Sequence, residues 1–119
     1  MSSIDLNTLK QRLREFADER DWNQFHSPKN LAMALSVEVA EIVEHFQWLS
    51  EEQSKNLPQN KLAEVEAELA DTFIYLIRLA DKLDIDLFAA TRRKMAVNEE
   101  KYPIEKSRGN ARKYSDFDD

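Results

Sequence analysis

Residues that interrupt helices are scarce in this chain. It has one glycine, Gly109, among 119 residues, and its only prolines are Pro28, Pro58 and Pro103. Folds built from many short strands need glycine and proline at their turns, so this scarcity favours long helices. The sequence therefore predicts an all-α protein.

Apolar periodicity places four long helices and one short one. The long helices are expected at residues 4–21, 28–49, 61–83 and 85–101. Ser27 and Pro28 fit the N-cap and first position of the second helix, and Asp84 fits the cap of the last. A short helix should follow Ser50, and Pro103 should end the last long helix. We expect a helical domain over residues 1–103 and a polar tail over residues 104–119, which either stays mobile or folds over the active site.

Two pairs of acids interrupt the apolar stripes of the second and third long helices. Glu38 precedes Glu41 by three residues, and Glu68 precedes Asp71 by the same spacing, so each pair shares one face of its helix. A carboxylate that faces a core is costly unless it is paired or bound to a metal. Oxygen ligands suit Mg²⁺ or Mn²⁺, so the pairs indicate a cation site, unless they simply lie on solvated faces.

Charge and composition exclude several classes of protein. The chain has no cysteine and a net charge of −6, which argues against a disulfide framework and a nucleic-acid polymer partner. Residues 1–90 hold 17 acids against 9 bases, whereas residues 91–114 hold 8 bases against 3 acids. Acidic groups for a cation beside basic groups for phosphates fit a metal–nucleotide substrate.

The apolar runs are too short for a signal peptide or a membrane span, so we expect a cytoplasmic protein with no membrane partner.

Aromatic residues and a broad apolar helix indicate further contacts. Trp22, Phe25 and His26 lie in the first loop, where they either anchor the loop to the core or line a base pocket. Trp48 lies near a helix end and could face the core or a ligand. Residues 69–80 are apolar on more than one side of the helix, which predicts burial within a bundle or at a subunit interface, and hence an obligate oligomer.

The acid pairs and several longer segments resemble those of a known family. The pattern Glu38-x-x-Glu41, then 26 residues, then Glu68-x-x-Asp71 resembles the metal motif of MazG-like all-α nucleoside triphosphate pyrophosphohydrolases. Four segments of the chain, within about residues 9–114, resemble the dCTP pyrophosphatase branch of this family. They are ERDWNQFHSPKNLAMALSVEVAEIVEHFQW, ELADTFIYL, KMAVNEEKYP and ARKY. The resemblance implies a four-helix MazG-like bundle that assembles as a homo-oligomer, either a dimer or, as we expect, a dimer of dimers, with sites formed between subunits.

The resemblance also implies a reaction and a set of site residues. It implies Mg²⁺, replaceable by Mn²⁺, held by Glu38, Glu41, Glu68 and Asp71. It implies hydrolysis of a deoxynucleoside triphosphate, with dCTP or a modified dCTP as the best substrate, to the monophosphate and pyrophosphate, which clears the nucleotide pool. Glu38 or Glu41 would orient or deprotonate the attacking water. The substrate-binding residues would be Trp22, Trp48 and Tyr75 around the base, Asn98 near the nucleoside, His26, and, at the phosphates, Lys94, Lys101 and Tyr102, helped by Arg108, Arg112 and Lys113.

Two departures and two alternatives accompany this interpretation. Val37 precedes Glu38 where many relatives have a double glutamate, and Leu13 stands where animal dCTP pyrophosphatases have a histidine, which leaves the base preference open. A di-iron bundle would need Glu-x-x-His motifs, whereas the chain offers only Glu41 four residues before His45. The other alternative is a non-enzymatic helical interaction module with solvated acidic faces.

Overall fold

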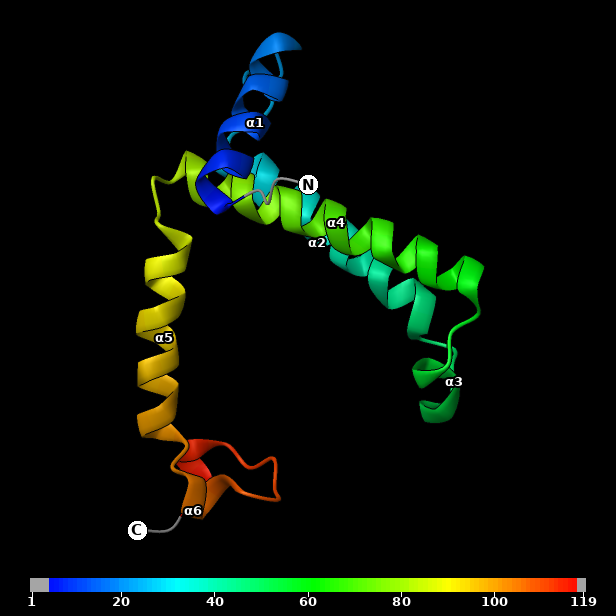
Figure 1. Ribbon diagram of the computed structural model, residues 1–119, viewed down its shortest axis with the longest axis vertical. Coiled ribbons are helices and arrows are strands. Elements are labelled where there is room, and N and C mark those ends of the chain that lie inside the picture. Colours follow the sequence, from blue (N-terminus) through cyan, green and yellow to red (C-terminus); the bar gives the residue numbers. More distant parts are fainter. Residues whose placement is uncertain (1–4, 118–119) are drawn as a thin grey trace. The chain divides into compact units, whose positions relative to one another are not determined.

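The computed structural model describes residues 5–117, and its regular elements there are all helical (Figure 1). This confirms the predicted all-α class. The elements are α1 (Leu6–Glu19), α2 (Pro28–Phe46), α3 (Glu51–Lys55), α4 (Gln59–Lys82), α5 (Leu87–Lys101), α6 (Ile104–Ser107) and a 3₁₀ turn, Tyr114–Asp116. They form two compact units that meet between Ile85 and Asp86. The predicted boundary between a helical domain and a tail at residue 103 stays a prediction.

The first unit is built on a pair of adjacent helices, α2 and α4. The chain runs along α2, turns through α3, and returns along α4, so that the two helices lie side by side (Figure 1). α1 packs on the later part of α4, where Arg14 forms hydrogen bonds with Asp81. The buried apolar residues of the described chain all come from these three helices: Ala17, Leu31, Val65, Ile77 and Ala80.

Side-chain caps begin most of the helices. Ser27 accepts a hydrogen bond from the Asn30 amide at 3.1 Å, with Pro28 at the first helical position. Ser50 and Gln53 form the expected capping box of α3. These local hydrogen bonds satisfy amides that a helix leaves free at its first turn, and they confirm the predicted starts of α2 and α3.

The junction after α4 corrects one expectation. Asp84 does not cap the next helix; that role belongs to Asp86, whose carboxylate accepts from the Ala89 amide at 3.0 Å. Asp84 instead adopts a left-handed conformation, with φ at 56°. Its amide bonds to the Asp81 carbonyl and the Ile85 amide bonds to the Ala80 carbonyl, which is the Schellman ending of a helix. Asp84 therefore stops α4, and the following helix begins two residues later than expected.

The second unit, from Asp86 to residue 117, folds its end around aromatic residues. The ring of Tyr102 meets those of Tyr114 and Phe117 edge-on, with centroids 6.0 Å and 5.7 Å away. Lys101 lies over the Tyr114 ring and Arg112 lies over the Phe117 ring. Such cation–π contacts hold basic side chains near the turn that follows α6.

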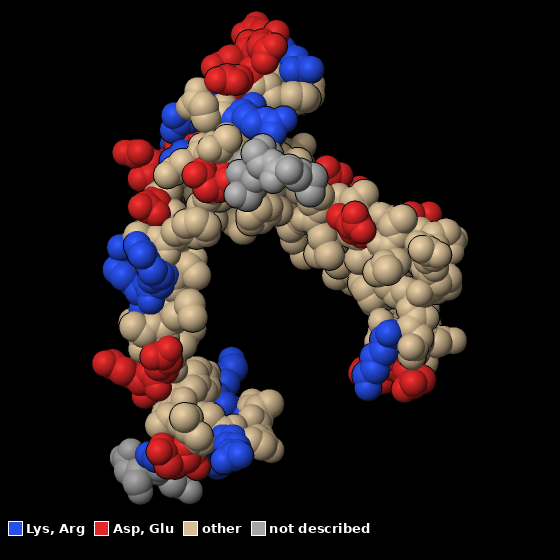
Figure 2. Space-filling view, in the orientation of Figure 1, with Lys and Arg blue, Asp and Glu red and all other residues tan. Residues whose placement is uncertain are grey.

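Large apolar side chains are widely exposed in the first unit. Examples are Met33, Val37, Val43, Leu69 and Phe73, each between 48% and 58% exposed. Much of the surface over α2 and α4 in Figure 2 carries no charged group. One copy of the chain thus leaves much of its apolar surface in contact with water. No helix within residues 5–117 has both the length and the apolarity needed to cross a membrane.

Candidate active site

A cluster of three carboxylates lies between α2 and α4. Glu38 and Glu41 are one turn apart on α2, and Glu68 approaches them from α4. One oxygen of each carboxylate lies within 4.8 Å of the others. The packing of α2 against α4 therefore brings residues 30 positions apart into one group of oxygen ligands.

The environment of this cluster fits a divalent cation. One oxygen of Glu38 and one of Glu68 are buried and have no hydrogen-bond partner in the described chain. The Glu68 carboxyl, close enough to share a proton, raises the pKa of Glu41, and Glu38 raises the pKa of Glu68 in the same way. Buried acceptors without donors and mutual repulsion are both relieved by a bound cation, and an all-oxygen ligand set suits a hard one.

A cavity of about 310 Å³ adjoins the cluster. Glu38 belongs to both features, because it is a member of the cluster and also lines the cavity. The other lining residues are Leu13, Phe16, Ala17, Trp22, His26, Asp71, Ile74, Tyr75 and Arg78. A mainly apolar hollow with a few polar groups is the usual form of a small-ligand site.

The fourth predicted metal ligand, Asp71, occupies a different place from the other three. It is exposed and lines the cavity, but it is not part of the group within 4.8 Å. Asp71 lies three residues after Glu68 on α4, so both carboxylates lie on the side of the helix near the cavity. Its part in holding a metal stays a prediction.

The predicted base-binding residues separate into two groups. Trp22, His26 and Tyr75 meet at the cavity, with the Trp22 ring 5.5 Å from that of Phe16 and 6.1 Å from that of His26. Trp48 does not line this cavity, and its side chain is 86% exposed. Phe25 is 59% exposed and lies outside the cavity as well.

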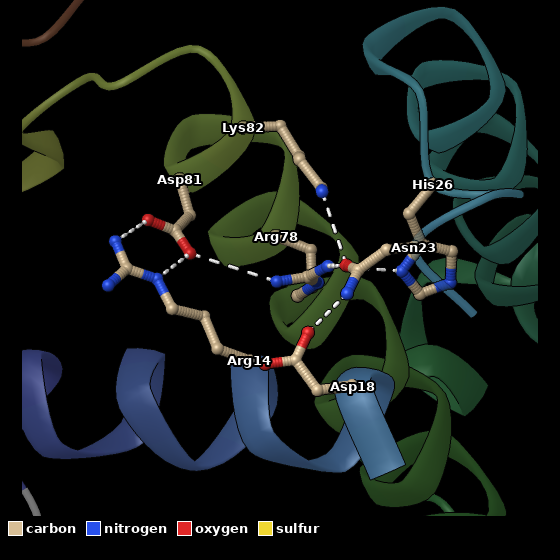
Figure 3. A network of polar contacts seen from close by, with 7 residues as sticks. All are labelled: Arg14, Asp18, Asn23, His26, Arg78, Asp81 and Lys82. Carbon is tan, nitrogen blue, oxygen red and sulfur yellow. Dashed lines mark hydrogen bonds and ion pairs between the residues drawn. The ribbon is translucent and has the colours of Figure 1, made fainter. Parts of the chain in front are cut away.

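In the wall of the cavity, Arg78 joins several elements through a polar network (Figure 3). Its Nη2 donates to Asn23 Oδ1 at 3.1 Å and lies 3.3 Å from His26 Nδ1. On the other side, Nη1 lies 3.7 Å from Asp81, which also accepts two hydrogen bonds from Arg14. Burial, and then the positive charges of Arg78 and Lys82, lower the pKa of His26, so its imidazole is neutral at neutral pH.

The predicted phosphate-binding residues lie in the second unit. Basic groups cover part of α5 in Figure 2, where the sequence has Arg92, Arg93 and Lys94. Asn98, Lys101 and Tyr102 follow on the same helix or at its end, whereas Arg108, Arg112 and Lys113 come after α6. Their roles stay predictions.

Sequence reasoning missed four members of the cavity wall: Phe16, Ala17, Ile74 and Arg78. Phe16 falls on the apolar stripe of α1, which indicated only core packing. Arg78 carried a clearer signal, because it is a lone cation in the apolar stretch of residues 69–80 and is only 4% exposed. A charge in such a stretch requires buried partners, which the structure supplies as Asn23, His26 and Asp81.

Comparison with known proteins establishes the family. The model of the MazG-like family matches residues 33–117, which include all the residues of the carboxylate cluster. This chain belongs to the MazG-like family. The predicted family and its all-α fold are thereby confirmed.

The chain is also similar to individual proteins whose names or structures are known. The chain is similar to the proteins named dCTP pyrophosphatase 1 from Mus musculus, with 43% identity over 94% of this chain and 67% of the relative, and from Homo sapiens, with 39% identity over the same shares. It is also similar to a pyrophosphatase from Archaeoglobus fulgidus whose crystal structure is known. That structure aligns with a TM-score of 0.79 and 43% identity over 87% of this chain and 96% of the other.

Proposed function

We propose that this protein is a nucleoside triphosphate pyrophosphohydrolase that converts a deoxynucleoside triphosphate to the monophosphate and pyrophosphate. We further propose dCTP, or dCTP modified at C5, as its best substrate and removal of unwanted nucleotides as its role. The observation that carries the proposal is the position of Glu38, which lies in the carboxylate cluster and in the wall of an aromatic cavity. The likeness to proteins named dCTP pyrophosphatase 1 supports it.

The carboxylate cluster suits the charged end of such a substrate. Glu38, Glu41 and Glu68 would hold the divalent cation, proposed to be Mg²⁺ and replaceable by Mn²⁺, with Asp71 as a further ligand. When bound, the cation offsets the negative charge of the carboxylates and the triphosphate. Without it, these acids would repel the substrate, so binding of the nucleotide and of the cation should be coupled.

The acids also provide a base for water. A water molecule attacks the α-phosphorus, a new P–O bond forms, and the bond from the α-phosphorus to the bridging oxygen breaks. Pyrophosphate leaves with that bridging oxygen. Glu38 or Glu41 would take up the proton that the water loses.

The cavity suits a nucleobase. Trp22 and Tyr75 provide apolar walls, and His26 provides polar atoms at its edge. A volume of about 310 Å³ is enough for one nucleobase. The preference for a single-ring base rests on the likeness to proteins named dCTP pyrophosphatase 1. Leu13 lines the same cavity, so the replacement of the animal enzymes' histidine by leucine lies where it would affect the choice of base.

The remaining substrate contacts would come from the second unit and from a second copy of the chain. Lys94, Lys101 and Tyr102 would meet the phosphates, aided by Arg108, Arg112 and Lys113, with Asn98 near the nucleoside. Trp48 is too exposed to act as a wall of the cavity within one copy, so its role would require a partner subunit. We therefore propose a homo-oligomer, a dimer of dimers, acting in the cytoplasm.

The two alternatives fit the described residues less well. A di-iron centre would recruit His45, yet its Nδ1 lies 3.8 Å from Glu64 and it is not part of the carboxylate cluster. A module with solvated acids would leave no carboxylate oxygen buried, whereas those of Glu38 and Glu68 are.

The test is a turnover panel of canonical and C5-modified nucleotides in Mg²⁺, with the products separated by chromatography. We expect dCMP and pyrophosphate from dCTP, with dATP and dGTP hydrolysed more slowly. Release of dCDP and orthophosphate would overturn the reaction, while a preference for dATP would overturn the base assignment alone.

A further inference from the structure

We propose that Arg78 is a positioning residue that keeps the ring proton of His26 on Nε2, so that the cavity offers a fixed N–H donor to the edge of the nucleobase. This inference rests on the proposed function, because it assigns the recognition of the base within that same cavity. Arg78 itself need not touch the base.

The starting observation is the burial of Arg78. A guanidinium that is 4% exposed in the wall of a cavity loses most of its contact with water, so its position depends on the partners around it. Its terminal nitrogens reach Asn23 and His26 on one side and Asp81 on the other. Its Nε has no partner in the described chain.

The contact with His26 decides the tautomer. A guanidinium can only donate hydrogen bonds, so the Nδ1 that lies 3.3 Å from Arg78 Nη2 must accept one. A neutral imidazole that accepts at Nδ1 carries its proton on Nε2. In Figure 3 the second ring nitrogen of His26 lies on the side of the ring away from Arg78, and it forms no hydrogen bond within residues 5–117.

The surrounding network holds Arg78 in place. Arg14 donates to both oxygens of Asp81, at 2.6 Å and 2.5 Å, and Asp81 pairs with Arg78 from the far side. Asn23 is fixed in turn by Lys82, at 3.2 Å, and by Asp18. Residues of α1, α4 and the first loop thus determine jointly where the guanidinium lies (Figure 3).

A fixed donor distinguishes bases by their acceptors. The ring nitrogen N3 of cytosine accepts a hydrogen bond, whereas N3 of thymine and uracil carries a proton and donates one. A donor held at that edge favours cytosine and leaves the others with two opposed N–H groups. Sites that recognise a ligand by hydrogen bonds discriminate more strongly than apolar walls do, so the His26 tautomer would supply selectivity that Trp22 and Tyr75 do not.

Nitrogen NMR of protein labelled with ¹⁵N-histidine measures this tautomer directly. The chain has two histidines, so a His45→Gln variant assigns the His26 signals. We expect the wild-type His26 to be neutral with its proton on Nε2, and its Nε2 signal to shift when dCMP is added. A proton on Nδ1 in the wild type would overturn the proposal, even if no Arg78 variant folds.

Two variants then test the cause. Arg78→Met should release Nδ1, mix the tautomers, and reduce the preference for dCMP over dTMP by about tenfold. The matched control is Lys82→Met, which removes a cation from the same network but leaves the contacts of Arg78 with Asn23, His26 and Asp81 in place. Asn23 is still held by Asp18, so the tautomer should stay on Nε2. An unchanged tautomer in Arg78→Met, with its helical signal intact, would overturn the proposal.

These readouts separate this inference from the proposed function. The tautomer and the binding of dCMP are measured without turnover. If dCTP is hydrolysed to dCMP and pyrophosphate while His26 carries its proton on Nδ1, the inference fails and the function stands. If the tautomer follows Arg78 but no triphosphate is hydrolysed, the function fails and the tautomer assignment stands.

Discussion

At the scale of single residues, the proposed site depends on individual carboxylates. Glu38 has a buried oxygen without a partner and also lines the cavity, so it links the acid cluster to the aromatic walls. Glu68 has a second such oxygen on the facing helix. Each of these acceptors should be satisfied by the cation.

Replacing Glu38 with glutamine should therefore abolish turnover. Changes to groups around a metal ligand already cost ~10–100-fold, so loss of a direct ligand should cost more than about 100-fold in kcat/KM. Mg²⁺ should raise the Tm of the wild type and have little effect on the variant. The metal-free variant should melt at a higher temperature than the metal-free wild type, because one repelling charge is gone. Glu66→Gln, an exposed acid on α4 outside the cluster, is the control, and equal losses in both variants would contradict this account.

Trp22 should determine affinity for the base. Stacking of one base on an aromatic side chain contributes ~1–3 kcal/mol, so Trp22→Ala should raise the KM for dCTP about tenfold or more while kcat changes little. Phe25→Ala is the matched control, since Phe25 lies in the same loop but outside the cavity. Steady-state kinetics that show the larger KM in the Phe25 variant would contradict the placement of the base.

At the scale of elements, the pairing of α1 with α4 depends on Asp81. The hydrogen bond from Arg14 lowers the pKa of Asp81, with help from the charges of Lys10 and Arg78. A carboxyl with a lowered pKa stabilises the fold above its unfolded pKa of about 3.9, and this contribution is lost as pH falls through the folded value.

Arg14→Met should consequently reduce stability at neutral pH and flatten its fall on acidification. Denaturant unfolding of the wild type and the variant between pH 7 and pH 3 measures the difference, which we expect to be largest above pH 4 and to shrink below it. Arg12→Met, for which the described chain shows no ion pair, removes the same charge from α1 and should leave the wild-type pH profile. A difference that grows with acidification would show that Arg14 acts by some other means.

The helix boundaries show which features could be predicted from neighbouring residues in the sequence. Ser27, Pro28 and Ser50 predicted helix starts correctly, because capping is decided by a few neighbouring residues. The prediction that Asp84 caps the next helix was wrong. An aspartate can cap the start of a helix or end one in the left-handed conformation, and only the packing of α4 decides which. The spacing of the acids placed each pair on one face of its helix, and the packing of α2 against α4 brings Glu68 to Glu38 and Glu41. The sequence could not show that Asn23 and His26 are partners of Arg78, because they come from a loop more than 50 residues away.

At the scale of the whole molecule, one copy of the chain leaves much apolar surface uncovered. Leu69 and Phe73 on α4 are about half exposed, as are Met33 and Val37 on α2. An apolar surface of this extent usually marks an interface. Sedimentation at micromolar concentration should show a species of at least twice the 13.9 kDa chain. Phe73→Glu should shift it toward the monomer, whereas a well-folded wild-type monomer would contradict the predicted oligomer.

We propose that the carboxylate cluster and the cavity form one site that directs water to the α-phosphorus. Hydrolysis of dCTP in ¹⁸O-labelled water, followed by mass spectrometry of both products, tests it most directly. We expect one ¹⁸O atom in dCMP and none in pyrophosphate. Label found in pyrophosphate instead of dCMP, or release of orthophosphate with dCDP, would contradict it.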